Sequence, residues 1–337
     1  MIRAGICGFG GMGHLHANNL WHMKDVKVVA VCDSRPEQLA AKDVAINIDA
    51  GRSDFDIRTC HTYTDFREML KREKLDVAVL PLPTYRHADY AILAMQAGCH
   101  VFTEKPMALT VADCDRMLRA RDRYRRQLLV GQVLRFWPEY EALRKTIERG
   151  TYGRLMSLTM ERNGAYASWA KDNWFNNHRL SGGAILDLHL HDVDWAVYAL
   201  GLPTSVQAAG RVGQTGGIDD VSALWDYKGG PLVTMRGTWL YTGFAMNFRA
   251  LFEKATIECG FSPDPGLRLL KGGAKPARIK VPAANAYHLE LRYLFDCVAG
   301  RKTNTICPGE STRESVRLVW VEKKAIAKSR GINPKRA

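Results

Sequence analysis

The feature that most constrains the fold is a glycine-rich turn close to the N-terminus. A short strand is predicted over Ile2–Cys7, and Gly8–Gly13 then read G-x-G-x-x-G. A helix is predicted over His14–Met23, followed by a second strand over Val26–Cys32 that ends at Asp33. A strand, such a turn, a helix and an acid about 20 residues on are typical of a dinucleotide-binding unit. The glycines let backbone approach a pyrophosphate, and the helix N-terminus offers free N–H groups to its charge.

The alternation of strands and helices continues to about residue 130. It predicts a doubly wound α/β domain over residues 1–130 with a parallel sheet, in which ligands bind at the carboxyl ends of the strands. Residues 48–62 are interpreted only as a long loop. The further predicted strands are Val77–Leu80, His100–Thr103 and Leu128–Gly131, and the further predicted helices are Glu37–Asn47, Tyr63–Glu73, Tyr85–Ala97 and Thr110–Tyr124.

The remaining residues, 131–337, are predicted to form a second, α+β domain. A helix over Pro138–Arg149 leads into short strand-like segments separated by glycine-containing turns, with few helices after Leu200. This pattern favours an open, mainly antiparallel sheet. The predicted strands are Leu155–Arg162, Pro203–Gly210, Ser222–Tyr227, Leu232–Leu240, Asn247–Phe252 and Ala255–Glu258, and the closing helices are Tyr287–Ala299 and Glu310–Lys328.

The segment Ser181–Asp194 carries the strongest candidate for acid–base chemistry. Its apolar residues recur at mixed helical spacing, which predicts a largely buried helix beginning near Gly183. Asp187 and His191 are four residues apart, so on one helix they share a face. A carboxylate beside an imidazole fixes the tautomer and supports a general base. The alternative is a structural His–Asp pair in a core.

Composition indicates a soluble globular protein, since 46% of the 337 residues are hydrophobic and 25% are charged. No apolar run is long enough for a membrane span, and the start lacks a signal-peptide pattern, so we expect a cytoplasmic protein. The eight cysteines include no C-x-x-C pair and no zinc spacing, which fits a reducing compartment.

The net charge of +13 leaves a nucleic-acid surface as an alternative. We expect a solvated helix face and a basic tail instead, because no DNA- or RNA-recognition motif accompanies the charge. We therefore expect no nucleic-acid or membrane partner. The basic residues are Arg119, Arg121, Arg123, Arg125 and Arg126, and then Lys323, Lys324, Lys328, Arg330, Lys335 and Arg336.

Four stretches together resemble one enzyme family. They are GFGGMGHLHA at 8–17, LPTYRHADYAILAMQAGCHVFTEKPMALT at 82–110, VGQVLRFWPEY at 130–140 and SGGAILDLHLHDVD at 181–194. The chain resembles the glucose–fructose oxidoreductase, inositol dehydrogenase and rhizopine catabolism (Gfo/Idh/MocA) family of NAD(P)-dependent oxidoreductases. The resemblance implies hydride transfer at a ring hydroxyl of a sugar, inositol or related polyol. Two alternatives are a non-catalytic NAD(P)-sensing regulator of the same fold and an NAD-dependent glycosidase.

The resemblance also implies roles for individual residues. It places the catalytic lysine at Lys105, the aspartate at Asp187 and the histidine at His191, and it implies a cis Lys105–Pro106 peptide. His191 would take the hydroxyl proton, and Lys105 would stabilise the developing negative charge. The cofactor-binding positions are Gly8, Phe9, Gly10, Gly11, Met12, Gly13, Asp33, Ser34, Arg35, Leu82, Pro83, Thr84, His87, Glu104, Lys105, Gln132, Arg162 and Trp174.

Position 189, often glycine in that family, is a histidine here, and it creates His189-x-His191 followed by Asp192 and Asp194. On a strand this pattern would favour a metal. On a helix His189 points away from the Asp187–His191 face, so we predict no metal site.

Two expectations concern partners. Asp33 should accept hydrogen bonds from the adenosine ribose and repel a 2′-phosphate, which favours NAD, although Arg35 could bind that phosphate and admit NADP. Helices were found for only one face of the second sheet. The other face should expose an apolar patch, with some of Trp225, Trp239 and Leu240, and a second subunit should cover it, giving a homodimer or homotetramer.

Overall fold

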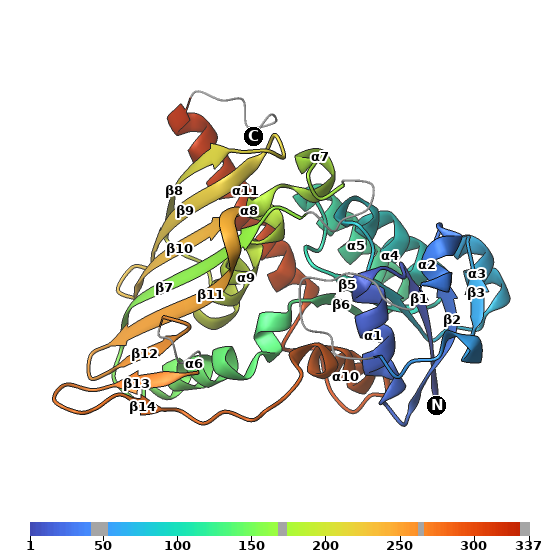
Figure 1. Cartoon of the computed structure of the whole chain (residues 1–337), viewed down its shortest axis with the longest axis horizontal. Coiled ribbons are helices and arrows are strands. Elements are labelled where there is room, and N and C mark those ends of the chain that lie inside the picture. The colour runs from blue at the N-terminus through green and yellow to red at the C-terminus, as the bar shows by residue number, and fades with distance from the viewer. Residues whose placement is uncertain (42–52, 168–173, 262–265, 331–337) are drawn as a thin grey trace. The chain divides into compact units, whose positions relative to one another are not determined.

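The computed structural model describes residues 1–41, 53–167, 174–261 and 266–330 (Figure 1). The chain forms two compact units that are not continuous in sequence. Unit 1 contains Met1–Val133 and Asn285–Arg313, and unit 2 contains Leu134–Ala284 and Glu314–Ala337. Within the described ranges, no helix combines the length and the apolar character needed to cross a bilayer.

Unit 1 is built on a six-stranded parallel sheet in the order β3-β2-β1-β4-β5-β6. The central strands β1 and β4 are mostly buried and largely apolar, as a sheet covered by helices on both faces requires. Strand order reverses between β1 and β4, which is where ligands bind in such sheets. The strands are β1 Ile2–Cys7, β2 Val26–Cys32, β3 His61–Tyr63, β4 Val77–Leu80, β5 His100–Glu104 and β6 Leu128–Gly131.

Three helices of unit 1, α3 Phe66–Arg72, α5 Val111–Tyr124 and α10 Ala286–Val298, begin at a residue whose side chain caps the first turn. The Thr110 hydroxyl accepts the Asp113 amide at 3.1 Å and so starts α5. The predicted helix over Glu37–Asn47 is shorter in the structure, since α2 ends at Ala40, and residues 42–47 lie outside the described residues. Strand β3 was not predicted. The helices are α1 Gly11–Trp21, α2 Pro36–Ala40, α3 Phe66–Arg72, α4 His87–Gln96, α5 Val111–Tyr124 and α10 Ala286–Val298.

Unit 2 contains an eight-stranded sheet in the order β14-β13-β12-β11-β7-β10-β9-β8. All its pairs are antiparallel except β7 with β10. The mainly antiparallel second sheet is therefore confirmed. The strands are β7 Leu155–Ala165, β8 Ser205–Val212, β9 Ile218–Asp226, β10 Leu232–Thr238, β11 Leu240–Phe252, β12 Thr256–Cys259, β13 Arg268–Leu270 and β14 Ala277–Arg278.

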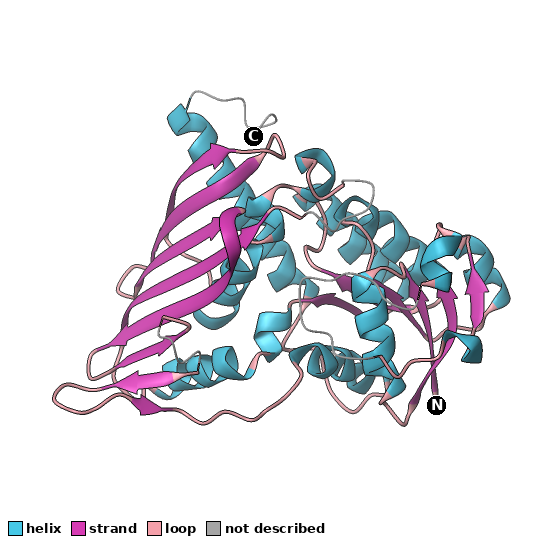
Figure 2. Ribbon diagram, in the orientation of Figure 1, coloured by secondary structure: helices cyan, strands magenta, loops and turns pink. Residues whose placement is uncertain are grey.

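Helices α9 and α11 lie against one face of this sheet (Figure 2). The indole of Trp225 faces that layer, because its Nε1 donates to Glu322 of α11 at 2.8 Å. The helices of unit 2 are α6 Pro138–Arg149, α7 His178–Ser181, α8 Ala184–Asp187, α9 Leu190–Leu200 and most of α11, Gly309–Arg330.

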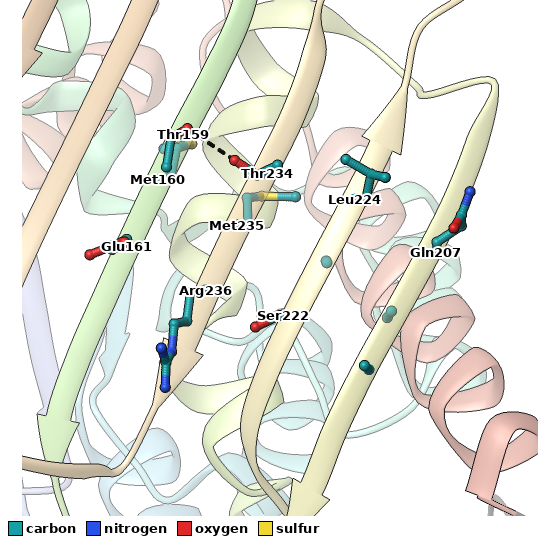
Figure 3. Close-up of a pocket in the computed structure, with 12 residues that line it drawn as sticks. Thr159, Met160, Glu161, Gln207, Ser222, Leu224, Thr234, Met235 and Arg236 are labelled. Atoms are coloured by element: carbon teal, nitrogen blue, oxygen red, sulfur yellow. Dashed lines mark hydrogen bonds between the residues drawn. The ribbon is translucent and has the colours of Figure 1, made fainter.

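The opposite face of the sheet is more polar than predicted. Trp225 and Trp239 are 0% and 4% exposed, so including them in an exposed apolar patch was wrong, whereas Leu240 is 54% exposed. Alternation along β9 turns the Trp225 indole away from that face, and Trp239 lies in the bend between β10 and β11. Figure 3 shows the open face over β7, β10, β9 and β8, where Thr159 and Thr234 approach to 3.0 Å beside Glu161, Ser222 and Arg236.

Candidate functional site

The glycine-rich turn has the shape that a pyrophosphate site requires. Gly8 has a φ of 101°, and a Cβ there would lie 2.6 Å from the Pro81 carbonyl oxygen. A Cβ on Gly13 would lie 2.2 Å from the Gly8 carbonyl oxygen. Both positions therefore need glycine, the first for its backbone conformation and the second for close packing. A Cβ on Gly10 would meet no atom of the described residues within 4 Å, so the described part of the turn is open on that side.

Helix α1 presents an uncapped N-terminus beside this turn. Gly10 is its N-cap residue, no side chain caps it, and no acidic residue lies in its first turn. Its first amide N–H groups are therefore available to an anion, and the helix dipole favours negative charge there. Phe9, Gly11 and Met12 complete the turn.

Asp33, directly after β2, is buried and bonded to its surroundings. Its Oδ2 accepts the Phe9 amide at 2.7 Å, and its Oδ1 accepts the Arg35 amide at 3.0 Å. A carboxylate has about four acceptor positions, so it retains capacity for ribose hydroxyls. The Arg35 guanidinium Nε lies 3.8 Å from Asp33 Oδ1, and the intervening Ser34 is exposed.

The other predicted residues of unit 1 follow the next strands at the same edge of the sheet. Leu82, Pro83 and Thr84 come after β4, Glu104 and Lys105 lie at the end of β5, and Gln132 follows β6. Since the sheet is parallel, these strand ends share one edge with the glycine turn and Asp33. The structure thus brings together every cofactor position predicted in unit 1.

His87 ties two of these loops together. Its Nδ1 lies 2.7 Å from the Pro106 carbonyl oxygen and its Nε2 lies 2.8 Å from the Leu82 carbonyl oxygen. Burial lowers the pKa of His87, against the opposing effect of these two hydrogen bonds. The ring therefore fixes the loop after β4 against the peptide that follows Lys105. That peptide, Lys105–Pro106, is cis, which confirms the prediction.

Gln132 adds two polar atoms at this edge. Its side chain is 1% exposed, and neither amide atom has a hydrogen-bond partner among the residues that the structure describes. A buried amide without partners is costly unless a ligand or water satisfies it. Together with the open glycine turn and the uncapped α1, this residue fits a bound dinucleotide.

In unit 2 the predicted single helix over the Asp187–His191 segment is wrong. Helix α8 ends at Asp187, and α9 begins at Leu190. The amides of Leu188 and His189 both donate to the Ala184 carbonyl at 2.9 Å, so the turn widens by one residue, as in a π-bulge. Asp187 is buried, and His191 is half-buried in the first turn of α9.

The remaining candidates of unit 2 have structural partners. His189 is fully buried with its Nε2 3.0 Å from Glu322 Oε2, which accounts for a histidine at this position. Arg162, 3% exposed, donates to Asp192 at 3.0 Å. Trp174 is half-buried, with its ring centroid 4.0 Å from that of Phe175. The contacts of Arg162 are internal to unit 2, and its cofactor role and that of Trp174 stay predictions.

Family descriptions match both units. The description "Oxidoreductase family, NAD-binding Rossmann fold" matches residues 2–132, and "GFO/IDH/MocA C-terminal domain" matches residues 140–258. The chain belongs to the Gfo/Idh/MocA oxidoreductase family. Unit 1 is accordingly its NAD-binding domain, and the predicted fold class is confirmed.

Relatives extend this family likeness over most of the chain. The myo-inositol 2-dehydrogenase of Thermotoga maritima is 28% identical over 68% of this chain and 66% of its own length. The D-glucoside 3-dehydrogenase of Escherichia coli is 28% identical over 78% of this chain and 75% of its own. The WlbA dehydrogenase of Bordetella pertussis, solved with NADH and UDP-GlcNAcA, superimposes with a TM-score of 0.79 at 23% identity, covering 97% of both chains. This last likeness shows the fold.

Proposed function

We propose that this Gfo/Idh/MocA protein is an NAD-dependent dehydrogenase that transfers hydride between nicotinamide and a ring hydroxyl or carbonyl of a sugar, inositol or polyol. The observation that carries the proposal is the edge of the unit 1 sheet. There, an open glycine turn, the uncapped α1 and Asp33 fit a dinucleotide, and Lys105 lies on the same edge at the end of β5. The named dehydrogenase relatives support the substrate class.

Oxidation of a carbinol removes a hydride from carbon and a proton from oxygen. NAD, when bound, accepts the hydride. We assign the proton to His191, because a neutral imidazole accepts protons near neutral pH. Asp187, four residues earlier, would hold the other ring nitrogen and stabilise the imidazolium. The Lys105 ammonium would donate a hydrogen bond to the same substrate oxygen and stabilise its developing negative charge.

A substrate screen tests the proposal. Purified protein would be given NAD or NADP with a panel of inositols, aldoses, glycosides and sugar acids, and reduced nicotinamide would be followed by absorbance. We expect oxidation of at least one polyol or sugar. Tight NAD binding with no turnover across the panel would favour a sensing role, and cleavage of a glycoside with NAD regenerated each cycle would favour a glycosidase.

Variants then test the assigned residues. His191→Ala and Lys105→Ala should each lower kcat about a hundredfold or more, the scale for a lost acid–base or oxyanion group. NAD affinity should change little in His191→Ala. His22→Ala and Lys71→Ala, on the surfaces after α1 and on α3, are matched controls that should keep full activity. Near wild-type turnover in His191→Ala would remove that residue from the mechanism.

A further inference from the structure

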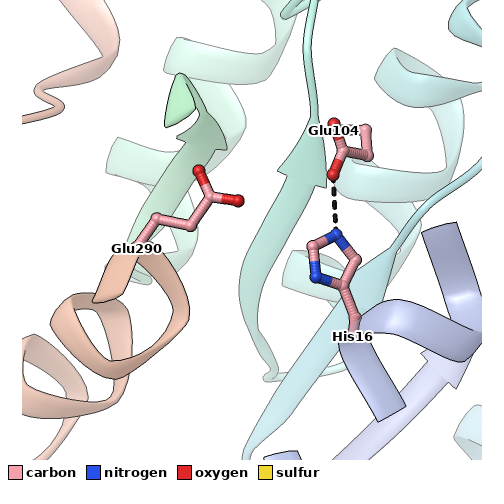
Figure 4. A group of neighbouring side chains, drawn as sticks. All are labelled: His16, Glu104 and Glu290. Atoms are coloured by element: carbon pink, nitrogen blue, oxygen red, sulfur yellow. Dashed lines mark hydrogen bonds and ion pairs between the residues drawn. The ribbon is translucent and has the colours of Figure 1, made fainter. Parts of the chain in front are cut away.

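A buried polar cluster lies inside unit 1 beneath the proposed NAD edge. His16 comes from α1, Glu104 from the end of β5 and Glu290 from α10, and Figure 4 shows the three side chains directed toward one another. Their exposed fractions are 0%, 8% and 0%. One nitrogen or oxygen atom from each lies within 4.8 Å of the others. We call these residues the His16–Glu104–Glu290 cluster.

Glu104 connects the cluster to the proposed catalytic lysine. Its Oε1 lies 2.6 Å from His16 Nε2, and its Oε2 accepts the backbone N–H of Lys105 at 3.2 Å. Burial acts to raise the pKa of Glu104, but the hydrogen bond and the charge of His16 outweigh it and lower that pKa. Glu104 is therefore an ionised acceptor whose position fixes the Lys105 backbone.

Glu290 faces this carboxylate from the other side. Neither of its carboxyl oxygens has a hydrogen-bond partner among the described residues, and both are buried. Burial, and then the charge of Glu104, raise the pKa of Glu290 well above its usual value. A second ionised carboxylate here would be repelled by Glu104 and left without solvent. An acid O–H within 4.8 Å of Glu104 and His16 can instead be linked to either one by a bridging water.

Among the described residues Glu290 forms no ion pair, and the His16 imidazole is paired with Glu104. Helix α10 packs here against α1, β5 and β6. Helix α1 presents His16, β5 presents Glu104, and β6, Leu128–Gly131, has no titratable side chain. On α10 itself Arg292 is engaged by Asp25 and Asp296.

A metal ion would be the other way to balance two carboxylates and an imidazole. Two ligand atoms that each lie about 2.0–2.1 Å from one ion are about 2.9 Å apart when the ligand–metal–ligand angle is about 90°, and farther apart at wider angles. His16 Nε2 and Glu104 Oε1 are closer, at 2.6 Å, which is the spacing of a charge-assisted hydrogen bond. The geometry therefore favours a shared proton over a shared ion.

We propose that Glu290 is a positioning residue: as a neutral acid it holds the Glu104 carboxylate between His16 and the Lys105 amide, and so sets the backbone of Lys105. Its catalytic consequence rests on the proposed role of Lys105. The effect of Glu290 on the position of Glu104 and the Lys105 backbone does not depend on that role, and it can be measured without a substrate.

Three variants test the structural part: Glu290→Gln, which keeps a neutral hydrogen-bonding group, Glu290→Ala, which removes it, and Glu68→Gln on the surface of α3 as a control. Amide hydrogen exchange at Lys105, followed by mass spectrometry or NMR, reports the Glu104 bond. We expect exchange about tenfold faster or more in Glu290→Ala, and wild-type exchange in Glu290→Gln and Glu68→Gln. The proposal would be overturned if the Lys105 amide exchanged at the wild-type rate in Glu290→Ala. It would also be overturned if exchange in Glu290→Gln were as fast as in Glu290→Ala.

The pH dependence of stability gives a second readout, which holds even if Glu290→Ala does not fold. The folded protein retains the Glu290 proton more strongly than the unfolded chain does, because the pKa of Glu290 is raised on folding. The stability that this proton contributes is complete below about pH 4.5, the ordinary pKa of glutamate, and is lost as pH rises toward the raised pKa of the folded state. The Tm of Glu290→Gln should therefore gain on that of the wild type as pH rises from about 5. Parallel curves would contradict a neutral Glu290, and so would a stoichiometric metal found by elemental analysis in the wild type and lost in Glu290→Gln.

Once a substrate is known, Glu290→Ala should lower kcat at least tenfold with little change in NAD Kd, and Glu290→Gln should restore it. A protein that shows the exchange and Tm effects but no dehydrogenase activity would retain the positioning inference and reject the proposed function. Normal kcat in a folded Glu290→Ala variant of an active enzyme would reject the catalytic consequence.

Discussion

The imidazole Nε2 of His189 lies 3.0 Å from Oε2 of Glu322, and neither side chain is exposed to solvent. The other oxygen of Glu322 accepts the Trp225 indole N–H at 2.8 Å. This pair joins the turn between α8 and α9 to α11 and β9, so it supports the backbone on which Asp187 and His191 are carried.

The His189–Glu322 pair should make the stability of the protein depend on pH. Burial acts to lower the pKa of His189, but the charge and hydrogen bond of Glu322 outweigh it and raise that pKa. The stability from this proton is therefore complete below about pH 6.5, the ordinary value for histidine, and is lost as pH rises through the raised folded pKa. His189→Gln should lower the free energy of unfolding by about 3–5 kcal/mol at pH 6, and by less at pH 8.5.

Thermal or urea unfolding across that pH range measures this difference. His22→Gln is the control, because the His22 side chain is 53% exposed and pairs with Asp54, whose side chain is 61% exposed. A wild-type advantage over His189→Gln that is the same at every pH would show that His189 is neutral in the folded protein.

Gly13 and Gly10, two of the four glycines of the NAD turn, should respond differently to substitution by alanine. Gly13→Ala forces a Cβ against the Gly8 carbonyl oxygen and should cost about 1–3 kcal/mol of stability, as overpacking does. A methyl group on Gly10 meets no atom of the described residues, so Gly10→Ala should leave the Tm nearly unchanged. We expect this methyl group to obstruct the approach of the pyrophosphate. We expect weaker NAD binding in both variants by fluorescence titration, and a lower Tm only in Gly13→Ala. Unaltered NAD affinity in Gly10→Ala would place the pyrophosphate elsewhere.

Asp33 should determine the choice between NAD and NADP. Asp33→Asn keeps an acceptor for the Phe9 amide but loses the charge, and a hydrogen bond to a charged group contributes about 1.5–3 kcal/mol. NAD affinity should therefore fall about tenfold to a hundredfold, while NADP affinity falls less or rises. Arg35→Ala should leave NAD affinity unchanged. A wild-type preference for NADP that Arg35→Ala abolishes would show that the guanidinium, rather than the carboxylate, selects the cofactor.

Self-association stays a prediction, with a revised surface. Leu240, Tyr241 and Phe244 lie within five consecutive residues of β11 and are 54%, 46% and 59% exposed. We expect a dimer or tetramer by light scattering at micromolar concentration, and weaker association in Phe244→Glu. Leu202→Glu, at an exposed apolar position after α9, is the matched control. A monomeric wild type would end the hypothesis.

Local signals in the sequence predicted much of the fold. Helix α6 has its predicted bounds, Pro138–Arg149, because a proline starts it and Gly150 ends it in the left-handed conformation. Strand β3 was missed because it is a three-residue edge strand without an apolar face. The break after Asp187 was missed because apolar residues recur across it at helical spacing, and because Glu322, the buried partner of His189, is 133 residues away on α11.

The candidate site was predictable to a similar degree. The positions along one sheet edge follow from the rule that ligands bind at strand ends, so Gly8–Gly13, Asp33 and Lys105 could be named in advance. His16 lies on the helix after the glycine turn and was not identified, since nothing local marks a histidine as the partner of a glutamate 88 residues away. Glu290 carries no local signal, because its proposed role depends on the packing of α10 beside α1.

The interleaving of the two units along the chain limits how the gene can be divided. The chain leaves unit 1 after Val133, returns to it at Asn285 and leaves it again within α11. Neither unit is therefore encoded by one continuous segment of the gene. A fragment that stops near residue 133 would lack α10, and its α1 would expose the face that α10 covers, with His16 and Glu104 deprived of Glu290. Recombination with a relative would therefore have to transfer residues 285–313 together with the first 133 residues, as a paired exchange at three breakpoints, to keep the NAD domain intact.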